Sequence, residues 1–162
     1  MKKNGKPVAI LTVGLPGSGK STYAANTDDS YTVLSRDELT TRSFRSELKK
    51  QTDDKCNIVI DQMNLSLEKR ISLISDLLIR GYQVKCVYFP CIKKQSISNV
   101  RLRTKREVAK LDRIEDASEI AKLRSERDQL ISLIPKLKLD KPCPHEGFSE
   151  ILVIVQTYKE SQ

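Results

Sequence analysis

The sequence is poor in aromatic residues and in histidine. Tryptophan is absent, aromatic residues make up 5% of the 162 residues, and the single histidine is His145. So few aromatic side chains exclude an extended platform on which nucleobases would stack. His145 lies in a turn-rich stretch at 142–149, where we expect a surface loop residue rather than a catalytic base.

Long apolar runs and paired cysteines are also missing. No run approaches the roughly 18 apolar residues of a membrane span, and the basic start at 1–3 is not followed by the apolar core of a signal peptide. Cys56, Cys86, Cys91 and Cys143 form no C-x-x-C pair, which argues against a zinc site and a disulfide framework. We therefore expect reduced thiols in a soluble cytoplasmic protein with no membrane partner.

Charge is plentiful and unbalanced. Lys and Arg number 29 against 21 Asp and Glu, which gives a net charge of +8. This excess favours an anionic partner such as a nucleotide or a nucleic acid, although a lysine-rich surface without a partner gives the same count. The length predicts a single domain over 1–162.

Short apolar runs alternate with longer amphipathic segments, which is the pattern of an α/β fold with a parallel sheet. We expect strands at 8–13, 31–34, 57–61, 83–89 and 150–155 and helices at 36–50, 66–80, 93–110 and 116–133. Ser35 and Glu38 are spaced as a capping box for the first of these helices. The second should bury the face that carries Leu67, Ile71, Ile74 and Leu78.

The most informative motif follows the first expected strand. It matches G-x-x-x-x-G-K-[ST], and its residues are Gly14, Leu15, Pro16, Gly17, Ser18, Gly19, Lys20, Ser21 and Thr22. In such a loop the backbone N–H groups surround phosphates, the lysine neutralises them, and the hydroxyl after it ligates Mg²⁺. We therefore predict that this loop binds ATP and that Ser21 is a metal ligand.

Five pieces of the sequence resemble, in family order, the kinase domain of the phage and animal polynucleotide kinases. They are the phosphate loop at 13–22, Ser-Arg-Asp-Glu at 35–38, Asp-Gln-Met-Asn-Leu at 61–65, Asn-Val-Arg-Leu-Arg at 99–103, and Glu-Gly-Phe-Ser-Glu-Ile at 146–151. The resemblance implies a five-stranded P-loop fold with a helical basic lid at roughly 93–133. It also implies transfer of the ATP γ-phosphate to the 5′-hydroxyl of DNA or RNA.

By this resemblance Asp37 is the general base that accepts the proton of the attacking hydroxyl. A carboxylate one strand away from the phosphate loop suits that role, although an aspartate at a helix start is also stabilised by the helix dipole. Arg36 is either a substrate contact or a structural ion-pair partner. Arg42 and Arg45 share a helix face that either contacts acceptor phosphate or is merely solvated.

The stretch after the third strand supplies a further set of candidates. Asp61 is placed where a carboxylate either orders Mg²⁺ through water or holds the phosphate-loop hydroxyl, and Asn64 either binds the acceptor strand or caps the strand end. Met63 departs from the family, which usually has threonine there. A hydroxyl contact to the acceptor is therefore missing.

The resemblance also assigns residues that contact ATP, both its phosphates and its adenine. Arg101 and Arg103 correspond to arginines that clamp the ATP phosphates, but a spacing of two places them on different sides of a helix. Phe148 either packs beside the adenine or fills the core.

We expect a polynucleotide 5′-hydroxyl kinase that uses ATP and Mg²⁺, without the phosphatase motif that larger relatives carry. The alternatives are a P-loop kinase with another acceptor, such as a nucleoside, another small molecule or a hydroxymethylated base in DNA, and a non-catalytic nucleotide-binding module.

Overall fold

A five-stranded parallel sheet forms the centre of the computed structural model, which describes residues 5–36 and 38–156. The strands are β1 (Val8–Gly14), β2 (Tyr31–Ser35), β3 (Asn57–Asp61), β4 (Gln83–Phe89) and β5 (Glu150–Val153). Their order is β2-β3-β1-β4-β5, and every adjacent pair is parallel. The predicted α/β fold class is therefore confirmed, with β5 shorter than expected.

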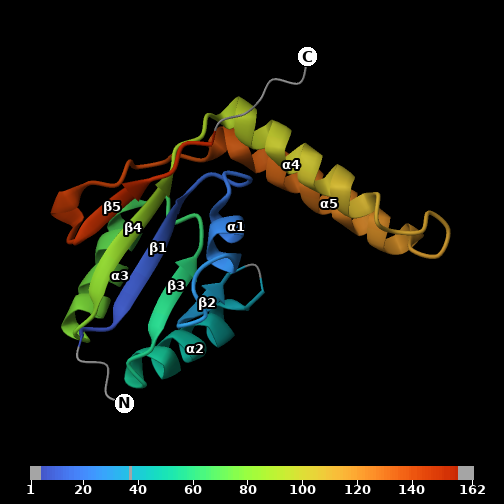
Figure 1. Cartoon of the computed structure of the whole chain (residues 1–162). Coiled ribbons are helices and arrows are strands. Elements are labelled where there is room, and N and C mark those ends of the chain that lie inside the picture. The colour runs from blue at the N-terminus through green and yellow to red at the C-terminus, as the bar shows by residue number, and fades with distance from the viewer. Residues whose placement is uncertain (1–4, 37, 157–162) are drawn as a thin grey trace.

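Five helices accompany the sheet (Figure 1). They are α1 (Lys20–Ala25), α2 (Thr41–Asp53), α3 (Leu67–Ile79), α4 (Lys93–Val108) and α5 (Ala117–Leu133), and two short 3₁₀ turns are η1 (Ile134–Lys136) and η2 (Pro144–Glu146). None of the helices in the described residues is long and apolar enough to cross a membrane.

Alternating side chains of the strands build a core on each face of the sheet. One face carries residues such as Leu11, Ile60 and Val84, which pack with side chains of α2 and α3. The opposite face carries Ile10, Val59, Val87 and Phe89, which pack with Ala24 of α1. The strands are apolar on both faces because helices cover both.

The helix expected at 36–50 begins later than predicted. Ser35 is the last residue of β2 and pairs with Asp61 of β3, so it cannot also cap a helix. The cap is Thr40, whose Oγ1 accepts a hydrogen bond from the Ser43 backbone N–H at 3.2 Å. Residues 36 and 38–40 therefore belong to a connection at the carboxyl edge of the sheet rather than to a first helical turn.

The buried face of α3 also differs from the prediction. Ile74 is buried as expected, but Leu67, Ile71 and Leu78 are exposed. The residues that share the interior with Ile74 are Leu77 and Arg70. Hydrophobic spacing did not predict a charged residue in the core. Because Arg70 is buried, the face of α3 that points inward differs from the face that carries Leu67, Ile71 and Leu78.

Arg70 is buried because every part of its guanidinium has a partner. Nε donates to Glu146 Oε2 at 2.7 Å and Nη2 donates to Glu146 Oε1 at 2.8 Å. Nη1 donates to the carbonyls of Asn64 and Leu65, each at 2.9 Å. The pair therefore joins α3 to the Glu-Gly-Phe turn before β5 and to the loop after β3.

The cysteines match the expectation of reduced thiols. Cys56, Cys86, Cys91 and Cys143 are all free. Burial raises the pKa of the Cys86 thiol to about 12, so this side chain stays protonated at neutral pH.

Glu146→Ala should lower the free energy of unfolding by about 3–5 kcal/mol, because it leaves a buried guanidinium without its counter-charge. Urea unfolding followed by circular dichroism measures this loss. The double variant Arg70→Met/Glu146→Leu should recover most of it, since no unpaired charge remains. Asp128→Asn, which breaks the exposed pair with Arg127, is the control and should hardly move the urea midpoint. An equally small effect of Glu146→Ala would contradict the role given to the buried pair.

Candidate functional site

The phosphate loop connects β1 to α1 and depends on its glycines. Gly17 and Gly19 have φ values of 69° and 102°, which side chains rarely tolerate. A Cβ on Gly14 would lie 2.6 Å from Ser18 Oγ and 2.9 Å from the Phe89 carbonyl oxygen. These glycines therefore allow the chain to turn tightly between β1 and α1.

Lys20 begins α1 and is almost completely buried, with 7% of its surface exposed. Its Nζ donates to the Leu15 carbonyl at 2.7 Å, across the loop. The ammonium is thus held inside the curve of the loop. Ser21, the next residue, is exposed and its side chain lines the adjacent cavity.

The loop after β3 supports the phosphate loop from one side. The Gly14 N–H donates to the Met63 carbonyl at 3.1 Å. Asn64 has a left-handed backbone with φ 47°, and its Nδ2 donates to the Thr12 carbonyl at 2.8 Å. Since Arg70 binds the Asn64 carbonyl, the buried ion pair also positions this support.

Helix α4 supports the phosphate loop from the other side. Ser96 Oγ donates to the Pro16 carbonyl at 2.6 Å, and Asn99 Nδ2 donates to the Gly17 carbonyl at 2.8 Å. A Cβ on Gly17 would lie 2.9 Å from that of Asn99, so the helix sits directly against the loop. The orientation of α4 is therefore coupled to the conformation of the loop.

A cavity of about 870 Å³ lies beside the loop. Its basic lining residues come from the loop, from the end of β2, from α3 and above all from α4. They are Lys20, Arg36, Lys69, Arg103, Arg106 and Lys110. Asp61 and Glu107 are the acidic residues of the lining. The cavity is therefore strongly cationic and suits a polyanion such as a nucleoside triphosphate.

The donor atoms fit magnesium held largely by phosphate. Ser21 and Asp61 both line the cavity, and hydroxyl and carboxylate oxygens are ligands that Mg²⁺ accepts. No group of three or more His, Cys, Asp or Glu residues that could hold a metal occurs within 5–36 and 38–156. Mg²⁺ typically takes only one or two protein ligands besides phosphate oxygens and water, so this small donor set is sufficient.

Asp61 is held at the end of β3 close to β1. The Thr12 hydroxyl lies 3.4 Å from Asp61 Oδ1, and also within reach of the Ile60 and Gln62 carbonyls at 3.3 and 3.1 Å. The carboxylate is 6% exposed. Its position at the carboxyl edge of the sheet follows from the strand register, which pairs it with Ser35.

The residues expected to contact substrate take different positions. Arg36 lines the cavity, donates from Nη2 to Thr41 Oγ1 at 2.9 Å, and lies 5.6 Å from the centre of the Phe44 ring. Arg42 is exposed on α2 and is not part of the cavity lining. Asp37, expected to be the general base, lies outside the described residues.

Phe148 belongs to the core and not to the cavity. It is 8% exposed and packs in the same cluster as Ile74 and Leu77 of α3. Of the two roles considered for it, the structure therefore supports filling the core, since Phe148 does not line the phosphate-loop cavity. The left-handed Gly147, with φ 105°, turns the chain so that Phe148 points inward.

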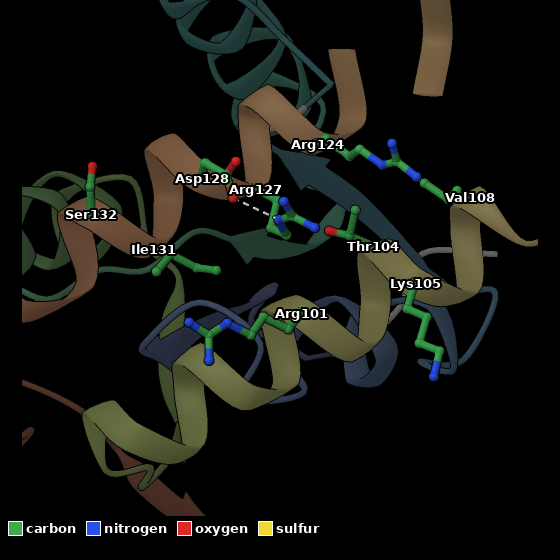
Figure 2. Close-up of a pocket in the computed structure, with 9 residues that line it drawn as sticks. All are labelled: Arg101, Thr104, Lys105, Val108, Arg124, Arg127, Asp128, Ile131 and Ser132. Atoms are coloured by element: carbon green, nitrogen blue, oxygen red, sulfur yellow. Dashed lines mark hydrogen bonds and ion pairs between the residues drawn. The ribbon is translucent and has the colours of Figure 1, made fainter. Parts of the chain in front are cut away.

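The two arginines assigned to the lid lie on different sides of α4, as their spacing requires. Arg103 lines the phosphate-loop cavity. Arg101 instead lines a second hollow between α4 and α5, together with Arg124 and Arg127 (Figure 2). The structure therefore brings Arg103, and not Arg101, to the phosphate loop.

Several residues at the site were missed from the sequence. Ser96 and Asn99 bind carbonyls of the phosphate loop, yet small polar residues on a basic helix gave no signal for that contact. Arg106 and Lys110 join Arg103 in the cavity, and their spacing of three and seven residues could have revealed this shared face. Gln156 also lines the cavity, and a Cβ on Gly19 would lie 2.0 Å from its Nε2.

Comparison with known proteins agrees with this geometry. A family model described as an AAA domain matches residues 10–57, which run from within β1 through the phosphate loop and β2 to the first residue of β3. No curated protein matches the chain at the level of sequence.

Solved structures share the whole fold. A candidate kinase from Chloroflexus aurantiacus J-10-fl is 12% identical with a TM-score of 0.61, over 95% of this chain and 90% of that one. A fungal RNA kinase is also 12% identical with a TM-score of 0.61, over 96% and 78% of the two chains. A structure of the PezAT toxin–antitoxin system of Streptococcus pneumoniae is 13% identical with a TM-score of 0.60, over 96% of this chain and 70% of that one. The fold of this chain is therefore the α/β fold of the P-loop kinases.

Asn64→Gly should lower the free energy of unfolding by about 0.5–1.5 kcal/mol, because it removes one hydrogen bond and keeps a backbone that tolerates positive φ. Asn64→Ala should cost about 1 kcal/mol more, since alanine resists the left-handed conformation. Urea unfolding of both variants measures the difference. Equal losses would show that the left-handed backbone at Asn64 contributes nothing.

Proposed function

We propose that the protein is an ATP- and Mg²⁺-dependent kinase that phosphorylates the 5′-hydroxyl ends of nucleic acid. One observation carries the proposal: a single cavity is lined both by the phosphate loop, with Lys20 and Ser21, and by cations of α4 and the turn after it, with Arg103, Arg106 and Lys110. Phosphoryl transfer needs little else from a protein than positioned charge around the moving group.

The roles follow from where the side chains lie. Lys20 and the loop N–H groups hold the phosphates of ATP, with Gly14, Pro16, Gly17, Ser18, Gly19 and Thr22 shaping that cradle. Ser21 and Asp61 would hold Mg²⁺, which would supply positive charge to neutralise the phosphates. Arg103 stabilises the charge on the equatorial oxygens of the transferred group.

The acceptor side is assigned to the segment between β2 and α2. Asp37 accepts the proton of the attacking hydroxyl, and Arg36, at the cavity wall, contacts the acceptor. With Arg103 on α4 across the cavity, we infer that α4 and α5 form the lid of the kinase domain.

Nucleic acid is favoured as the acceptor by charge. The chain carries a net charge of +8, and its cations extend along α4 and α5 beyond the cavity. Among the structures that share the fold is one of an RNA kinase. A small-molecule acceptor would need no cationic surface outside the cavity.

Labelled ATP should transfer its γ-phosphate to a 5′-hydroxyl oligonucleotide in preference to a nucleoside or a duplex that carries a hydroxymethylated base. Lys20→Ala should nearly abolish this transfer, because the phosphates lose their main cationic side chain. Transfer to the nucleoside alone would overturn the proposed acceptor. ATP binding without transfer to any acceptor would overturn the assignment as a kinase.

Arg103→Ala should lower kcat/KM for transfer by about 10²–10³-fold, as expected for the loss of a group that stabilises transition-state charge. Arg101→Ala is the matched comparison on the same helix and should have a smaller effect on kcat, because Arg101 faces away from the cavity. Arg103→Lys should restore little activity, since an ammonium cannot replace the planar, two-pronged guanidinium. Steady-state kinetics with saturating ATP measures all three. A larger loss of kcat for Arg101→Ala would contradict the placement of the two arginines.

A further inference from the structure

A second cationic hollow lies between α4 and α5 (Figure 2). It has a volume of about 670 Å³, and its charged residues are Arg101 and Lys105 of α4 and Arg124, Arg127 and Asp128 of α5. A further hollow of about 720 Å³ lies along the same two helices, toward the loop that joins α4 to α5. It shares Lys105 and Arg124 with the first and adds Arg113. We call the two hollows together the interhelical groove.

The interhelical groove is separate from the phosphate-loop cavity. The two share no lining residue. The separation arises on α4 itself: Arg101 and Lys105, four residues apart, face the groove, whereas Arg103 and Arg106 face the cavity. The groove cations are therefore not needed to hold ATP.

The positive charge of the groove is not neutralised from within the protein. Its one acidic residue, Asp128, is already paired with Arg127, at 2.7 Å from its Nε. The hydrogen bond from Arg127 lowers the pKa of Asp128, and the charge of Arg101 lowers it further. Within the described residues, no hydrogen bond or ion pair joins Arg101, Lys105 or Arg124 to a carboxylate. Three exposed cations thus line the interhelical groove.

We propose that the interhelical groove binds the phosphate backbone of a single-stranded nucleic acid downstream of the end that is phosphorylated. The inference rests on the proposed function for the identity of the acceptor. Cations from both helices line the groove, so one phosphate backbone that follows it would meet positive charge on both sides.

The side chains of the groove fit a backbone better than bases. Arginine and lysine contact phosphates without regard to sequence. Val108 and Ile131 supply an apolar floor, and no aromatic ring lines either hollow on which a base could stack. We therefore expect binding that depends on strand length and salt and not on sequence.

Binding of the full chain to a fluorescent 5′-hydroxyl oligonucleotide tests the proposal, with an arm of roughly a dozen nucleotides and an arm of a dinucleotide. The test variant is Lys105→Gln/Arg124→Gln. The control, Lys94→Gln/Lys122→Gln, removes the same charge from exposed positions of the same two helices outside the groove. Anisotropy is measured without ATP over a range of salt concentrations.

The test variant should bind the longer strand about ten-fold more weakly, and the log–log salt slope should become shallower by about 1.4, as for two lost phosphate contacts on a single strand. The control should bind like the original protein, and Lys105→Arg/Arg124→Lys should keep most of the affinity. In transfer assays the test variant should raise KM for the longer strand and leave KM for the dinucleotide unchanged.

Equal behaviour of the test variant and the control would overturn the inference while leaving the proposed kinase untouched. Groove-dependent binding to vesicles that contain phosphatidylserine, without binding to the oligonucleotide, would overturn it in favour of a membrane surface. Groove-dependent binding of the oligonucleotide by a protein that phosphorylates no nucleic acid would support the groove and refute the proposed function.

Discussion

The buried pair of Arg70 and Glu146 is the contact on which the geometry of the site depends. Two charge-assisted hydrogen bonds tie α3 to the turn before β5, and Nη1 of the same guanidinium holds the carbonyls of Asn64 and Leu65. Asn64 in turn holds Thr12 at the end of β1, where the phosphate loop begins. Burial excludes water from the pair, so these contacts strengthen one another and fix one arrangement of the loops.

Helix α4 links three parts of the molecule because different sides of it face different neighbours. Its buried side, with Ser96, docks on the phosphate loop. A second side, with Arg103, faces the cavity, and a third, with Arg101, faces α5. Any rotation of this helix would therefore change the loop, the cavity and the interhelical groove together. The contacts of Ser96 and Asn99 make such a rotation costly, since each would leave a loop carbonyl without its donor.

The sequence predicted the sheet, the order of elements and the phosphate loop, because apolar runs and glycine spacing are local signals. Prediction failed where the position of a residue depends on a partner that is distant in the sequence. Ser35 extends β2 because it pairs with Asp61 of β3, and Arg70 is buried because it forms an ion pair with Glu146. The same limit applied at the site: the spacing of Arg101 and Arg103 showed that they diverge, but only the packing of α4 showed that Arg103 lines the phosphate-loop cavity and Arg101 the hollow beside α5.

The two sides proposed for the site, one for ATP and one for the acceptor, are held in place by different contacts. This difference affects how specificity for the acceptor arises. The phosphate loop is held from both sides by hydrogen bonds to its backbone, so its shape depends little on what is phosphorylated. The side proposed for the acceptor consists of Arg36 and of exposed cations on α4 and α5, which do not support the loop. Under the proposed function, substitutions there change the choice of acceptor and leave the phosphate loop undisturbed. A shared fold at 12–13% identity shows the fold alone, so the proposed acceptor has to be argued from the charged surface of this chain.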